Sequence, residues 1–278
     1  MRITLPGDGP VLCFGGPYSN LEATRALRTE ARRLGIPAER VICTGDIVAY
    51  CANPVETANE IRDWGCHVIK GNCEEQLAAR ADNCGCGFGA ETTCDLLSRG
   101  WYEYADAQMT DDLRDWMAGL PDAITFELTG RTFRVIHGGV TMINRFIFPS
   151  TPAAEKSAEL EAAKADVVVA GHSGLPFGET VAERYWFNPG VIGMPANDGT
   201  TDGWFGIITP EADSSLTFAL KRLAYDAESA AASLQTAGFA QPYVEALVTG
   251  RWPSTDVLPE KERLSSGRPL RDVEQMLA

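Results

Sequence analysis

The feature that most constrains this sequence is the regular alternation of short apolar segments with longer amphipathic ones over residues 1–72. The apolar segments are PVLCFGG at 10–16, RVICTGD at 40–46 and CHVIKGN at 66–72. Each has the length of a buried strand and ends in glycine or in glycine plus a polar residue. The intervening segments, 19–35 and 53–65, space their apolar residues as in a helix and end in glycine. This alternation predicts a parallel βαβ arrangement and an α/β fold.

The remainder of the chain continues this pattern without a break in composition. Residues 73–122 are predicted to be mainly helical, as an insert that contains cysteines in the segment DNCGCGFG. Residues 124–139 have the pattern of two hairpin strands, and later apolar segments predict further strands. Residues 226–278 are predicted to form a C-terminal helical extension. We therefore predict a single domain over residues 1–278.

Charge and cysteine content exclude several classes of protein. The 38 acidic residues outnumber the 24 basic ones, which gives a formal net charge of −14. Such a charge opposes binding to nucleic acid or to an anionic membrane. No apolar stretch is long enough to span a bilayer, and the N-terminus has no signal-peptide pattern, so we expect a cytoplasmic location. The eight cysteines, all within the first 94 residues, are then expected to be reduced rather than paired in disulfides.

Polar side chains that can bind a metal follow four of the predicted strands. They are Asp46, Asn72, His137 and His172, and the chain has only three histidines in all. Ligands of open α/β sheets bind at the carboxyl ends of the strands, so these four residues are expected to converge. A carboxylate, an amide and two imidazoles suit Mn, Fe or Zn. Each residue taken alone also fits a structural role, such as a turn for Asp46 or a core position for a histidine.

The order of these motifs, GD, GN, HG and GH, resembles that of the calcineurin-like metallophosphoesterases. Four longer segments are similar to those of the small bacterial phosphodiesterase branch of that family: SNLEA at 19–23, GDIVAYCANP at 45–54, FNPGVIGMP at 187–195 and LAYDAESAAASLQTAGF at 223–239. The resemblance covers nearly the whole chain. It implies a four-layer α/β sandwich, with two mixed sheets flanked by helices. It also implies hydrolysis of a phosphate mono- or diester by a metal-bound hydroxide.

Members of this family usually bind two metals, and this chain departs from the family pattern in one half of the site. The ligands that the resemblance assigns to the second metal are all present, as Asp46, Asn72, His137 and His172. Three ligand positions of the first metal carry Gly16, Tyr18 and Gly174 instead. The resemblance therefore implies a remodelled site with a degenerate first metal position. We expect one divalent or trivalent ion per chain, Mn, Fe or Zn, although replacement ligands would allow two.

The resemblance also indicates which residues lie beside the reacting group. The histidine of the family's GNH motif, which resembles a general acid, is Cys73 in this chain. Cys73, Tyr18 and His137 are accordingly the candidate catalytic residues, and Glu74 is expected to orient a neighbouring ligand. Activity is expected to be weak on poor leaving groups and better on activated esters such as aryl phosphates. The substrate is expected to be a small phosphorylated molecule or a nucleotide.

The glycine-rich segment after the first strand has two interpretations. Gly15, Gly16, Ser19 and Asn20 join a strand to a helix N-terminus, where backbone amides can bind an anion. The same residues also fit a tight turn with a helix cap. The sequence alone leaves both interpretations open.

The cysteine segment and the overall function have alternatives too. Cys73, Cys84 and Cys86 either form another metal site, since thiolates bind Zn and Fe, or are ordinary buried thiols. The protein as a whole is either a phosphoesterase or a non-catalytic module on the same fold that binds a metal and a phosphorylated metabolite. No oligomeric state is predicted.

Overall fold

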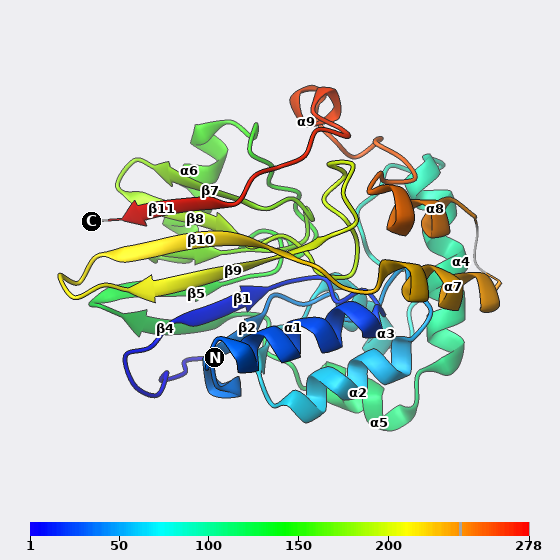
Figure 1. Ribbon diagram of the computed structural model, residues 1–278, viewed down its shortest axis with the longest axis horizontal. Coiled ribbons are helices and arrows are strands. Elements are labelled where there is room, and N and C mark those ends of the chain that lie inside the picture. The colour runs from blue at the N-terminus through cyan, green and yellow to red at the C-terminus, as the bar shows by residue number, and fades with distance from the viewer. Residues whose placement is uncertain (239–240, 278) are drawn as a thin grey trace.

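The computed structural model describes residues 1–238 and 241–277 of the chain. Two β-sheets pack face to face, and helices cover the outer face of each sheet, which makes a four-layer sandwich (Figure 1). Each sheet contains both parallel and antiparallel strand pairs. The prediction of an α/β fold with two mixed sheets is confirmed.

The first sheet is built around the predicted parallel unit. Its strands run in the order β11 (Val273–Leu277), β10 (Leu216–Leu223), β9 (Gly203–Pro210), β1 (Val11–Phe14), β2 (Val41–Cys43) and β3 (His67–Val68). The connections within the parallel part are α1 (Leu21–Arg33), the short 3-10 helix η1 (Ala38–Arg40) and α2 (Pro54–Trp64). Strands β9, β10 and β11 continue the sheet with antiparallel pairing. The parallel unit therefore places the carboxyl ends of β1, β2 and β3 at one edge.

The second sheet combines a hairpin with a short parallel unit. Its strands run in the order β4 (Ile124–Leu128), β5 (Arg131–Val135), β6 (Val167–Val169), β8 (Arg184–Asn188) and β7 (Phe177–Val181). The predicted hairpin is present as β4 and β5, which are antiparallel. Strands β5, β6 and β8 are parallel, so their carboxyl ends also share one edge.

Alternating side chains of the central strand divide the core into layers. Leu12 and Phe14 of β1 pack with the helices that cover the first sheet. Val11 and Cys13 of the same strand pack between the two sheets. All four are fully buried, as expected for a strand whose successive side chains point to opposite faces and whose faces are both covered.

The remaining helices belong to the insert, to the second sheet and to the C-terminal part. They are α3 (Asn72–Ala79), α4 (Thr93–Gln108), α5 (Asp111–Ala118), α6 (Ala153–Ala163), α7 (Ala227–Thr236), α8 (Gln241–Thr249) and α9 (Glu260–Leu264). The C-terminal part differs from the helical prediction at its end, because Val273–Leu277 is strand β11 beside β10 (Figure 1). This pairing covers backbone groups that β10 would otherwise expose at a sheet edge. Among the described residues, no helix is long and apolar enough to cross a membrane.

Candidate metal centre

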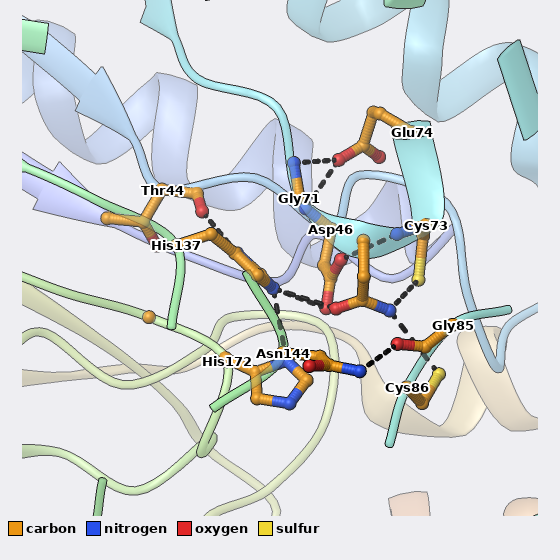
Figure 2. A network of polar contacts seen from close by, with 12 residues as sticks. Thr44, Asp46, Gly71, Cys73, Glu74, Gly85, Cys86, His137, Asn144 and His172 are labelled. Atoms are coloured by element: carbon orange, nitrogen blue, oxygen red, sulfur yellow. Dashed lines mark hydrogen bonds and ion pairs between the residues drawn. The ribbon is translucent and has the colours of Figure 1, made fainter. Parts of the chain in front are cut away.

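Four strand ends bring the predicted ligands together between the two sheets. Asp46 follows β2 and Asn72 begins α3 just after β3, while His137 and His172 follow β5 and β6. Figure 2 shows Asp46, His137 and His172 pointing toward one another. One ligand atom from each of these three residues lies within 4.8 Å of the others, and all three side chains are buried.

The Nε2 atom of His137 is the centre of the cluster. It lies 3.0 Å from Oδ1 of Asn72, 3.1 Å from Nδ1 of His172 and 3.2 Å from Oδ2 of Asp46. Ligand atoms at about 2.0–2.2 Å from a common metal are themselves about 2.8–3.6 Å apart. The observed spacing is therefore compatible with a coordination shell.

The proton on His137 can be placed from its other nitrogen. Nδ1 lies 2.7 Å from the carbonyl oxygen of Thr44, and a carbonyl oxygen only accepts hydrogen bonds. Nδ1 therefore carries the proton in the neutral ring, and the Nε2 lone pair faces the cluster. Lone pairs of His137, Asp46 and Asn72 then point at one another, which is unfavourable unless a cation or a proton lies between them. This donor set fits a bound metal.

Burial and neighbouring charges shift the pKa values of the three titratable residues in the cluster. Burial alone would raise the pKa of Asp46, but His137 and His172 outweigh it and lower this pKa to about 2. Burial alone would lower the pKa of His137, but the Asp46 carboxylate outweighs it and raises that pKa. Burial, aided by His137, lowers the pKa of His172 to about 3, so this ring is neutral at pH 7.

Backbone groups of the insert orient two of the candidate metal ligands through hydrogen bonds. The N–H of Cys73 donates to Oδ1 of Asp46 at 3.2 Å and leaves Oδ2 for the cluster. The amide nitrogen of Asn72 donates to the carbonyl oxygen of Cys84 at 2.9 Å, which turns Oδ1 toward His137. Asp46 has φ +57°, a left-handed conformation that aspartate tolerates better than most residues. The segment containing Cys84 thus orients a ligand through its main chain.

Glu74 acts on the metal-site loop rather than on a ligand side chain. Its carboxylate accepts hydrogen bonds from the backbone N–H groups of Asp46 at 2.8 Å, Ile47 at 2.7 Å and Gly71 at 2.9 Å (Figure 2 shows Glu74 beside Gly71). Gly71 must be glycine here, because a Cβ would overlap the Asp46 carboxylate. Burial, followed by the charge of Asp46, raises the pKa of Glu74 to about 7. Glu74 therefore fixes the backbone that carries Asp46.

Comparison with known families identifies the fold that builds this cluster. The model of the calcineurin-like phosphoesterase superfamily domain matches residues 19–211, which include all four strand-end ligands. The chain belongs to the calcineurin-like phosphoesterase superfamily. A curated relative, an uncharacterized protein of Methanocaldococcus jannaschii, is 44% identical over 55 residues. That match covers 20% of this chain and 22% of the relative.

Two solved structures share the fold of this chain at low sequence identity. A metallophosphoesterase from Sphaerobacter thermophilus superposes with a TM-score of 0.68 at 20% identity, covering 88% of this chain and all of the other. A hypothetical protein from Pyrococcus horikoshii OT3 superposes with a TM-score of 0.72 at 16% identity, covering 90% of this chain and all of the other. At such identities the similarity establishes the fold alone.

Aromatic rings lie beside Gly16 and Gly174, two of the positions where the sequence resemblance implies ligands of a first metal. Gly16 has φ +45°, and a Cβ there would lie 2.6 Å from Cζ of the buried Tyr18 ring. A Cβ on Gly174 would lie 3.3 Å from Cζ2 of Trp252. Tyr18 also packs edge-on against Tyr50, with ring centroids 4.7 Å apart. Aromatic rings thus pack closely against both glycines.

The segment after β1 is a turn and a helix cap. The backbone N–H groups of Gly16, Tyr18, Ser19 and Asn20 all donate to main-chain carbonyl oxygens. The Asn20 side chain accepts from the N–H of Ala23 and caps α1. The backbone amides of Gly16, Tyr18, Ser19 and Asn20 are thus occupied, which favours the tight turn with a helix cap, while an anion site at Gly15, Gly16, Ser19 and Asn20 stays a prediction.

The three cysteines of the alternative metal site surround Asn72. Its amide nitrogen lies 3.5 Å from Sγ of Cys73 and 3.5 Å from Sγ of Cys86. Cys84 and Cys86 form a disulfide, whereas all eight cysteines were expected to be reduced. The expectation fails at this pair because the turn at Gly85 brings the two sulfur atoms together. A thiolate metal site would require reduction of that bond.

Three residues contribute to the site although the sequence analysis did not identify them. Thr44 acts through its carbonyl oxygen, so its side-chain type gives no indication of the role. Phe146 places its ring centroid 4.3 Å from that of His172. Trp252 comes from the C-terminal part, and its ring lies against Gly174, two residues after His172. Only the position of Thr44, two residues before Asp46 at a strand end, could have suggested its involvement.

Proposed function

We propose that this chain is a metal-dependent phosphoesterase that acts on a phosphate mono- or diester with a single metal ion. The ion would be held by Asp46, Asn72, His137 and His172. The observation that carries the proposal is the 3.0–3.2 Å spacing of three donor atoms around Nε2 of His137. A bound Mn, Fe or Zn ion would polarise a phosphoryl oxygen and lower the pKa of water.

The chain's own residues orient the reaction but supply no strong acid for the leaving group. Cys73 stands where the family has an imidazole, and burial raises the pKa of its thiol, as does the charge of Asp46. Burial likewise raises the pKa of the Tyr18 phenol. Cys73 and Tyr18 therefore border the reacting group as packing and hydrogen-bonding groups. The leaving group must depart largely as an anion, which favours activated esters.

Dependence on the leaving group tests this proposal. The metal-loaded protein would be assayed with aryl phosphodiesters whose phenol leaving groups range from 4-nitrophenol to phenol. Because general acid catalysis contributes about 10²–10⁴-fold, we expect kcat/KM to fall by roughly 10²-fold or more across the series. Equal rates across the series would contradict the absence of a general acid. Metal binding without turnover of any ester would instead support a non-catalytic metal- and phosphometabolite-binding module.

The cysteine cluster gives a second prediction about metal content. The shortest hydrogen bond that the Asn72 amide donates goes to the main-chain carbonyl oxygen of Cys84, at 2.9 Å, and serine keeps this group, so the double variant Cys84→Ser, Cys86→Ser should keep its metal. We expect the metal content of this variant, measured by elemental analysis with and without a dithiol reductant, to equal that of the wild type. A loss of metal in the variant would show that Cys73, Cys84 and Cys86 provide ligands.

The single-domain organisation and the cytoplasmic location belong to the same proposal. The helices of residues 73–122 support one domain, because Cys73 and Cys84 contact the ligands of the central cluster. Six of the described cysteines carry no disulfide, which is typical of a reducing compartment. The substrate is proposed to be a small phosphorylated molecule.

A further inference from the structure

A cavity of about 90 Å³ adjoins the metal centre at His172. Its walls come from the β1 turn, the insert, the segment after β8 and the C-terminal part. The apolar and aromatic residues lining it include Tyr18, Leu97, Phe146, Val191, Met194 and Trp252. A volume of this size exceeds the roughly 10–15 Å³ that one water needs and suits part of a ring or a short alkyl chain.

The cavity offers no counter-charge to an anion. Among its described lining residues there is no Lys, Arg, Asp or Glu. Transfer of a phosphate or carboxylate from water into such a lining would cost far more than transfer of an apolar group. A negatively charged group is therefore accommodated at the metal centre and not in the cavity.

The walls of the cavity are fixed by hydrogen bonds and ring packing. The backbone N–H of Trp252 donates to Oδ1 of Asn197 at 2.9 Å, and its indole N–H donates to the carbonyl oxygen of Pro195 at 2.6 Å. The ring of Phe146 lies against that of His172 and connects the cavity to the metal centre. Pre-formed apolar cavities with a few polar groups at one end are typical of small-molecule sites.

Two lining residues of the cavity stand at positions where the sequence resemblance implies ligands of a first metal. Tyr18, at one missing ligand position, lines the cavity, and so does Gly174, at another. The ring of Trp252 stands against Gly174, where a larger side chain would project. Tyr18 and Gly174 thus belong both to the cavity lining and to the part of the cluster where the resemblance implies a departure from the family pattern.

We propose that this cavity binds an apolar substituent, a small aromatic ring or a short alkyl group, of a phosphorus ester whose phosphoryl group lies at the metal centre. The inference rests on the proposed function and names its substrate class. Nucleotides and polyphosphates are disfavoured, because their sugar and additional charges would face an uncharged apolar wall. The cavity selects among substrates through hydrophobic burial of the substituent rather than through ion pairs with it.

A matched pair of ligands tests the cavity without requiring turnover. Phenylphosphonate and methylphosphonate carry the same phosphoryl group and differ in the size of the apolar substituent. We expect the metal-loaded protein to bind phenylphosphonate about 10- to 100-fold more tightly in calorimetric titration, since a ring gains more from burial than a methyl group. Thymidine 5′-monophosphate should bind more weakly than phenylphosphonate.

Two neighbouring leucines of α4 provide a variant and its control. Leu97 lines the cavity, whereas Leu96 is 54% exposed and is not part of the lining. Leu97→Lys should reduce the preference for phenylphosphonate at least about fivefold, because it brings a charge to the apolar wall. Leu96→Lys should leave the preference unchanged.

The outcomes separate this inference from the proposed function. Equal affinities of the two phosphonates, or no measurable binding of phenylphosphonate, would overturn the assignment of the cavity. An unchanged preference in Leu97→Lys would do the same. Turnover of bis(4-nitrophenyl) phosphate by the same protein preparation reports on the proposed function, and it can succeed while the cavity assignment fails.

Discussion

Replacing Glu74 by alanine should lower the free energy of unfolding by about 3–5 kcal/mol, one of the largest effects expected for any side chain outside the apolar core. Glu74 is fully buried and accepts three short hydrogen bonds from the backbone of the metal-site loop. Its removal leaves the N–H groups of Asp46, Ile47 and Gly71 buried without acceptors. Each unpaired buried donor costs about 1–3 kcal/mol. Urea-induced unfolding of the metal-free protein measures this loss.

A neighbouring residue and an isosteric substitution sharpen this test. Glu75 is the next residue on α3 and is exposed, so Glu75→Ala should change stability by less than about 0.5 kcal/mol. Glu74→Gln keeps the volume but puts an NH2 group where one oxygen accepts, so it should also be destabilising. If Glu74→Ala were as stable as Glu75→Ala, Glu74 would not be what holds the loop.

Replacing His172 by alanine should weaken metal binding by more than about 10²-fold. Loss of groups that merely support metal ligands costs roughly 10–100-fold in affinity, so loss of a direct ligand should exceed that range. His172 places Nδ1 at 3.1 Å from Nε2 of His137, inside the cluster. The affinity would be measured by competition with a chelator of known strength.

The third histidine provides a matched control for this substitution. His67 begins β3 and makes no contact in the cluster of described ligands, so His67→Ala should retain the affinity of the wild type. An unchanged affinity in His172→Ala, with His67→Ala behaving identically, would mean that the metal is bound elsewhere.

The fold and the convergence of the four candidate ligands could be predicted because both depend on local sequence pattern. Buried parallel strands are continuous apolar runs, and each ends where glycine allows the chain to turn. Asp46, Asn72, His137 and His172 occupy such strand ends, so sheet geometry alone brings them together. The resemblance to the family, and not this pattern, implied a departure at Gly16 and Gly174.

Other features depend on long-range packing that no local pattern encodes. The main-chain carbonyl groups of Thr44 and Cys84 accept hydrogen bonds from His137 and Asn72. Any side chain at these two positions would leave such carbonyl groups in place. Trp252 reaches the site only because the C-terminal part folds back over it. The residues of strand β11 are mostly exposed, so its sequence has no alternation of apolar and polar residues that would predict a strand. The strand forms because the edge of β10 is available for pairing. The Cys84–Cys86 bond depends on the conformation of a single turn.

The central claim is that one metal ion is held by Asp46, Asn72, His137 and His172. Its most direct test is elemental analysis of the wild-type protein, purified without chelator and then reloaded separately with Mn, Fe and Zn. We expect one ion per chain for at least one of these metals, and close to none in His172→Ala under the same conditions. Two ions per chain, or none after reloading with all three metals, would contradict the account.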